Sequence, residues 1–186
     1  MMIRTFIALE LPDELKEKLV EIRNDFYHDD GKVRWEAKNK LHLTFKFLGD
    51  TDESEIVTIW EEVLKILEQF KPFSMTFNGF GIFKRDGQPR IFWAGFKENK
   101  VLENLVNEID NKCSKYGFPI EKRKFSPHLT LLRIKGYEKI DLIYKIVNTK
   151  FEPINFIANT ITFYKSELKP SGSEYAVLKQ ILLNKE

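Results

Sequence analysis

The chain has 186 residues, of which 42% are hydrophobic and 31% charged, with a formal net charge of +2. This composition supplies a packed core and excludes a disordered chain, and the near balance of charge does not favour strong nonspecific binding to nucleic acid. The single cysteine, Cys113, excludes an internal disulfide and favours a reducing, cytoplasmic setting. One cysteine and three histidines give no zinc-ligand spacing, so we expect neither a metal nor another cofactor.

The hydrophobic pattern predicts strands that alternate with helices. Residues 1–10 form an apolar run too short for a signal peptide or a membrane span, so we expect a strand there and no membrane contact. In chain order we then expect a helix over 15–26, strands over 33–35 and 41–48, a helix over 56–67, a hairpin of 73–83 and 90–96, a helix over 101–116, a strand at 128–131, a helix over 140–147, and strands over 155–164 and 175–183 around a turn at Pro170-Ser171-Gly172.

Two of the expected strands contain the same motif, a histidine followed two residues later by a threonine. His42 and Thr44 form the first copy, and His128 and Thr130 form the second. Side chains alternate between the two faces of a strand, so each copy presents an imidazole beside a hydroxyl. One such motif is typical of an ordinary buried strand, but two copies that use two of the three histidines favour a functional site.

The two motifs lie in an internal repeat, because each half of the chain shows the order strand, helix, motif strand, helix and further strands. Such a repeat predicts two lobes related by approximate two-fold symmetry, with the motif strands meeting at their junction. We therefore expect a single α+β domain over residues 1–186, built from lobes at about 1–90 and 91–186, between which strands could be exchanged.

Two histidines and two threonines can act together on a phosphate ester without a metal. Cleavage of a phosphodiester needs a base, an acid and donors that hold the charge on the nonbridging oxygens. An imidazole ordinarily titrates near neutrality, so a pair such as His42 and His128 can supply an acid and a base, and Thr44 and Thr130 can donate to the phosphate. The residues themselves leave open which histidine is the acid.

Two basic residues close to the motifs are candidate phosphate ligands. Lys46 has the same parity as His42, so we expect it on the same face of its strand. Arg133 has the opposite parity to His128 and reaches that face only if a bulge or the strand end turns it. Solvated positions at the rim of a strand would explain both residues equally well.

Trp35 and Phe83 are candidates for stacking on nucleic-acid bases, although ordinary core packing would explain them at least as well. If stacking is their role, the chain could be a noncatalytic module that binds RNA ends. Two titratable histidines favour an enzyme instead, because binding needs only hydrogen-bond donors whereas proton transfer needs groups that gain and lose protons.

The motifs and their flanks resemble a known family. The runs that carry the resemblance are RTFIA at 4–8, VRW at 33–35, LHLTFKFLG at 41–49, PRIFWAG at 89–95, FSPHLTLLR at 125–133 and YKSEL at 164–168, with Gly172 and Tyr175. With them the chain resembles the two-histidine phosphoesterases, and within that group the RNA 2′,3′-cyclic phosphodiesterases once called 2′-5′ RNA ligases. Glu36-Ala37-Lys38 departs from the family, whose members often carry prolines after the tryptophan.

The resemblance implies a bilobed α+β fold with antiparallel sheets lining a central cleft and helices on the outside. It also implies hydrolysis of 2′,3′-cyclic phosphates to 2′-phosphate ends, with His42 as general acid toward the 3′-oxygen and His128 as the base that activates water. Thr44 and Thr130 would hold the phosphate, and Arg133 would assist. RNA ends or nucleotides with a cyclic phosphate would be the partners of a chain that we expect to be monomeric.

Two related activities would use the same site. One is ATP-independent 2′-5′ ligation, which runs the chemistry backward. The other is cleavage of cyclic ADP-ribose phosphates or oligoadenylates.

Overall fold

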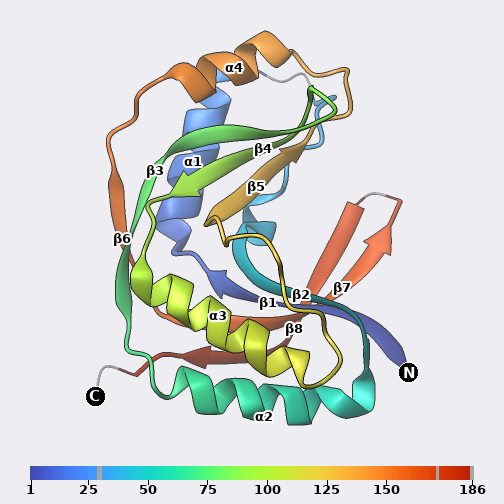
Figure 1. Ribbon diagram of the computed structural model, residues 1–186. Coiled ribbons are helices and arrows are strands. Elements are labelled where there is room, and N and C mark those ends of the chain that lie inside the picture. The colour runs from blue at the N-terminus through green and yellow to red at the C-terminus, as the bar shows by residue number, and fades with distance from the viewer. Residues whose placement is uncertain (29–30, 171, 185–186) are drawn as a thin grey trace.

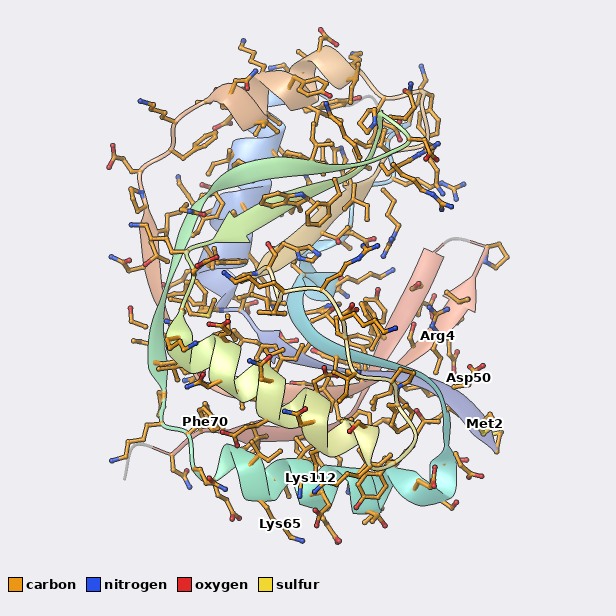
Figure 2. All side chains as sticks on the ribbon, viewed as in Figure 1. Met2, Arg4, Asp50, Lys65, Phe70 and Lys112 are labelled. Atoms are coloured by element: carbon orange, nitrogen blue, oxygen red, sulfur yellow. The ribbon has the colours of Figure 1, made fainter. Side chains whose placement is uncertain are left out.

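The computed structural model describes residues 1–28, 31–170 and 172–184 (Figure 1). The strands are β1 (Met2–Glu10), β2 (His42–Asp52), β3 (Phe73–Arg85), β4 (Gln88–Phe96), β5 (His128–Arg133), β6 (Ile154–Ala158), β7 (Thr160–Lys169) and β8 (Gly172–Leu182). The α-helices are α1 (Asp13–Phe26), α2 (Ile56–Leu67), α3 (Lys100–Ser114) and α4 (Ile140–Asn148), and two short 3₁₀ helices are η1 (Lys38–Lys40) and η2 (Glu53–Glu55).

The strands form two four-stranded antiparallel sheets. Sheet 1 has the order β2-β1-β7-β8, and sheet 2 has the order β5-β4-β3-β6. The two motifs therefore begin the edge strand of each sheet, His42 in β2 and His128 in β5. These edge strands approach each other, with Cα atoms within 8 Å, and we call this region the β2/β5 junction.

Each sheet is accompanied by two helices, and the predicted α+β fold is confirmed. In Figure 1, α2 lies along the bottom of the view and α3 lies above it, in front of sheet 1, while α4 lies at the opposite end, where it contacts α1. The helices pack through apolar stripes at helical spacing, as in α1, where Leu15, Leu19 and Ile22 are buried. The stripes join the inner strand residues in one continuous core, which fixes the edge strands at the junction.

Two predicted strands are wrong in detail. Residues 33–35 make only an isolated bridge, from Trp35 to Leu132 of β5. The predicted strand over 155–164 is two strands, because β6 ends at Ala158 and joins sheet 2 whereas β7 begins at Thr160 and joins sheet 1. An unbroken apolar pattern cannot show that a chain changes sheets. The last turn was predicted at Pro170-Ser171-Gly172, and its Ser171 lies outside the described residues.

The sheets do not follow the two halves of the chain. β7 and β8 from the second half complete sheet 1, and β3 from the first half is an inner strand of sheet 2. In the part of the chain that the structure describes, no helix is long and apolar enough to cross a membrane.

Candidate active site at the junction of the two sheets

The two motif strands share one backbone irregularity. In β2, Phe45 is skipped between the pairs Ala8–Thr44 and Ile7–Lys46, and in β5, Leu131 is skipped between Trp93–Thr130 and Phe92–Leu132. Each skipped residue directly follows the motif threonine, and each is buried. A bulge of this kind adds one residue to the strand and reverses the facing of every residue beyond it.

The first bulge turns Lys46 away from the face of His42, so the expectation that the two residues share a face is wrong. Lys46 is buried, and its ammonium group donates to the Asp110 carboxylate on α3 and to the carbonyl of Pro119. The other Asp110 oxygen accepts from the backbone N–H of Glu121 at 2.9 Å. Lys46 thus ties the bulge to the helix behind sheet 1.

The second bulge turns Arg133 to the side of His128. A bulge was one of the two ways in which Arg133 could reach that face. The Arg133 side chain is 58% exposed, and its Nε lies 4.0 Å from Glu36 Oε1. Glu36 itself is held by its backbone N–H, which donates to the Leu131 carbonyl at 2.9 Å. Arg133 therefore presents an exposed charge at the junction, close to one carboxylate.

Both motif histidines are oriented in the same way. His42 Nδ1 lies 2.7 Å from the carbonyl oxygen of Lys40, and His128 Nδ1 lies 2.8 Å from that of Ser126. A carbonyl oxygen only accepts hydrogen bonds, so Nδ1 carries the proton in each ring. Any proton exchange at either ring would therefore use Nε2.

His42 is surrounded by aromatic rings. Phe6 stacks on the imidazole with a centroid distance of 4.8 Å, and Tyr164 and Tyr175 lie at 5.8 and 5.2 Å. This burial lowers the pKa of His42 to about 4, against a smaller raising effect of the bond to Lys40 and with a further lowering effect of the Lys16 charge. The ring is therefore neutral at pH 7 in the free protein.

A carboxylate lies beside His42 on the neighbouring strand. Glu10 pairs with His42 across β1 and β2, and it accepts from Lys16 Nζ at 2.8 Å and from the Tyr164 hydroxyl. Lys16 is itself buried. The three groups form a satisfied polar cluster that holds Tyr164 against the aromatic surroundings of His42.

His128 has a different neighbourhood, made by two rings of sheet 2. Phe83 presents an edge contact at 4.8 Å, and Trp93 lies at 6.3 Å. The Trp93 indole lies over two glycines, since a Cβ on Gly81 or Gly95 would come within 2.2 or 2.6 Å of its ring atoms. Among the described residues, Trp93 Nε1 is a buried donor without a hydrogen-bond partner.

The two predicted stacking residues differ in what covers them. Trp35 packs into the fold, with Tyr27 against it at 5.2 Å, Phe92 at 6.1 Å and the Arg23 guanidinium over its ring at 5.0 Å. This arrangement favours the core-packing alternative for Trp35. Phe83 is half-buried and touches His128, so it stays a candidate.

Several residues of the site were missed by sequence reasoning. They are the aromatic neighbours Phe6, Tyr164, Tyr175 and Trp93, together with Glu10. All of them except Glu10 lie in runs that carry the family resemblance, and that was the available signal. Among the described residues, no group of three His, Cys, Asp or Glu could hold a metal ion.

A duplicated fold, with one oriented histidine and one threonine on each facing edge strand, defines a class of two-histidine phosphoesterases. The profile of the family described as LigT like Phosphoesterase matches residues 9–93 and 96–175. The chain belongs to this family, as its motifs suggested.

Relatives of known name cover almost the whole chain. An RNA 2′,3′-cyclic phosphodiesterase of Thermotoga maritima is 36% identical over 94% of this chain and 92% of its own length. One of Methanocaldococcus jannaschii is 33% identical over 95% of this chain and 99% of its own. Among solved structures, Thermus thermophilus TT0787 superposes with a TM-score of 0.78 at 26% identity, covering 97% of both chains. Escherichia coli LigT with 3′-AMP gives 0.75 at 23% identity over both whole chains, a likeness of fold.

Proposed function

We propose that the chain hydrolyses 2′,3′-cyclic phosphate ends of RNA to 2′-phosphates. The observation that carries this proposal is the matched orientation of His42 and His128, each with Nδ1 bound to a backbone carbonyl and Nε2 left for proton transfer. The names of the relatives from Thermotoga maritima and Methanocaldococcus jannaschii support the reaction, and a LigT structure with 3′-AMP supports a nucleotide ligand.

The proposed reaction needs the two histidines on opposite sides of one phosphorus atom. His128 Nε2 takes a proton from water, whose oxygen bonds to phosphorus while the bond from phosphorus to the 3′-oxygen breaks. His42 Nε2 gives its proton to the 3′-oxygen, leaving a 3′-hydroxyl and a 2′-phosphate. Thr44, Thr130 and Arg133 donate to the nonbridging oxygens, where negative charge gathers.

The acid role requires His42 to be protonated when the substrate is bound. An acid must be protonated, and burial lowers the His42 pKa to about 4 in the free protein. The negative charge of a bound cyclic phosphate favours the imidazolium and raises this pKa. We therefore expect His42 to take up its proton together with the substrate, so that substrate binding at neutral pH is accompanied by proton uptake.

The deciding experiment offers the protein three substrates in parallel. These are an RNA with a 2′,3′-cyclic phosphate end, a cyclic mononucleotide, and paired tRNA halves, each with and without EDTA. We expect 2′-phosphate products that persist with EDTA and are lost in His42→Ala and His128→Ala.

Two of the alternatives, ligation and noncatalytic binding, have their own result in this assay. Joined RNA as the main product would indicate a ligase, and tight binding without turnover would indicate an RNA-end-binding module. Activity lost with EDTA and restored by a divalent cation would contradict a metal-independent reaction. We further propose a monomer in the cytoplasm, which gel filtration and cell fractionation would test.

A further inference from the structure

A carboxylate faces His42 from the neighbouring strand. Glu10 of β1 lies directly opposite His42 of β2 in the antiparallel pair. The side chains of such a pair share a face, with Cβ atoms about 4.5–5.5 Å apart. A free carboxylate at this range favours the imidazolium and would raise the pKa of the ring by roughly 1–3. The ring bonds instead to the backbone carbonyl of Lys40, and the Glu10 carboxylate has other partners.

Both oxygens of Glu10 are occupied. Oε2 accepts from the Lys16 ammonium group at 2.8 Å, and Oε1 accepts from the Tyr164 hydroxyl. The Lys16 side chain is only 7% exposed, so water screens this ion pair little. The pKa of His42 is in fact lowered to about 4, chiefly by burial, and the Lys16 charge adds to this lowering. The carboxylate beside His42 is thus neutralised by its own partners.

Three further titratable groups lie around this cluster. Tyr175 of β8 is 5.2 Å from the imidazole, and burial raises the pKa of its hydroxyl, so it is neutral at pH 7. Asp13 lies 3.8 Å from Lys16 but is 78% exposed, so water screens its charge. His128 begins β5, on the other side of the β2/β5 junction. None of the three places an unscreened negative charge beside the imidazole at pH 7.

We propose that Lys16 and Tyr164 are positioning residues that occupy both oxygens of Glu10 and so keep His42 uncharged until an anionic phosphate binds beside it. The charge of the substrate then completes the acid, whereas a ligand without negative charge leaves it unprotonated. This inference rests on the proposed function, because it concerns when the proposed acid takes up its proton.

The first test follows the imidazole signals of the ligand-free protein by NMR as pH is changed. Lys16→Met removes the ammonium group and keeps an apolar stem, so Glu10 is left with an unpaired charge. The midpoint of the His42 titration should rise from about 4 by about one pH unit or more. Lys18→Met is the matched control, because this lysine lies on the same helix, is 57% exposed and pairs with an exposed glutamate. It should leave the midpoint unchanged.

Two further variants test whether the effect passes through Glu10. Tyr164→Phe keeps the ring against Phe6 but frees one carboxylate oxygen, so it should raise the midpoint in the same direction and by less. Combining Lys16→Met with Glu10→Gln removes both charges of the pair and should cancel most of the rise. If Lys16→Met does not fold, the Tyr164→Phe titration decides.

The second test measures the pH dependence of kcat/KM on a nucleoside 2′,3′-cyclic phosphate. This profile reports the free protein, so one of its limbs should move together with the NMR midpoint. An unchanged midpoint in both Lys16→Met and Tyr164→Phe would overturn the inference, as would a rise in the double variant as large as in Lys16→Met. If the midpoints move as expected but the wild-type protein hydrolyses no cyclic phosphate, the proposed function fails and the control of the His42 charge by Glu10 stands.

Discussion

β2 and β5 have the same backbone course and the same motif, but they differ in the side chains around each histidine. Each begins with a histidine whose Nδ1 is bound to a carbonyl, and each bulges after the threonine. Beyond the bulge, Lys46 in β2 corresponds to Leu132 in β5, and both are buried. The repeat thus keeps the orientation of both histidines and the bulge after each threonine, while the surroundings of each histidine differ.

The aromatic side chains around His42 differ from those around His128. His42 is enclosed by Phe6, Tyr164 and Tyr175, which lower its pKa, and His128 borders Phe83 and Trp93. A repeated backbone arrangement thus holds two imidazoles in unlike environments, and unlike environments would give two chemically identical groups the separate acid and base roles that we propose.

The largest effect should come from removing either histidine. His42→Ala and His128→Ala should each reduce kcat by roughly 10²- to 10⁴-fold, and the double variant should be little worse than the weaker single one, because the pair acts as a unit. A substrate whose leaving group departs unprotonated assigns the roles, since only loss of the acid should then be tolerated. Rescue of His128→Ala in place of His42→Ala would reverse them.

The second-largest effect should come from replacing Lys46, the buried residue that corresponds to Leu132 in β5. Lys46→Met leaves the Asp110 carboxylate buried without its ammonium partner, which should cost about 3–5 kcal/mol in the free energy of unfolding. Denaturant unfolding measures this loss, and adding Asp110→Leu should recover part of it. A stable Lys46→Met variant with weakened substrate binding would restore Lys46 to the site.

This lysine also shows what the sequence could and could not predict. Periodicity predicted the four helices, the motif strands and the likeness of the halves, because those patterns are local. It placed Lys46 beside His42, since alternation holds only for a strand without a bulge, and Phe45 looks like any apolar strand residue. The packing of Phe6 and Tyr164 around His42 depends on pairing between β1 and β7, distant segments that no local pattern connects.

A third prediction concerns pH and the enclosure of His42. Its pKa is about 4 when folded and 6.5 in the unfolded reference, so the unfolded chain binds this proton more readily. The contribution to stability is complete above pH 6.5 and is lost as pH falls toward 4, a change on the order of 2–3 kcal/mol. His42→Gln should lose this part of the pH dependence in denaturant titrations at pH 7.5 and 4.5. An unchanged dependence would mean that the ring is not desolvated.

The smallest effect should come from the threonines. Thr44→Ala and Thr130→Ala each remove a neutral donor to the phosphate but leave proton transfer in place, so each should cost about 1–3 kcal/mol in transition-state stabilisation. Steady-state kinetics measure this as a change in kcat/KM. The serine variants keep the hydroxyl and should lose little activity. If serine were as harmful as alanine at either position, that threonine would act through its methyl group in packing, and the likeness of β2 and β5 would extend to the histidines but not to the phosphate ligands.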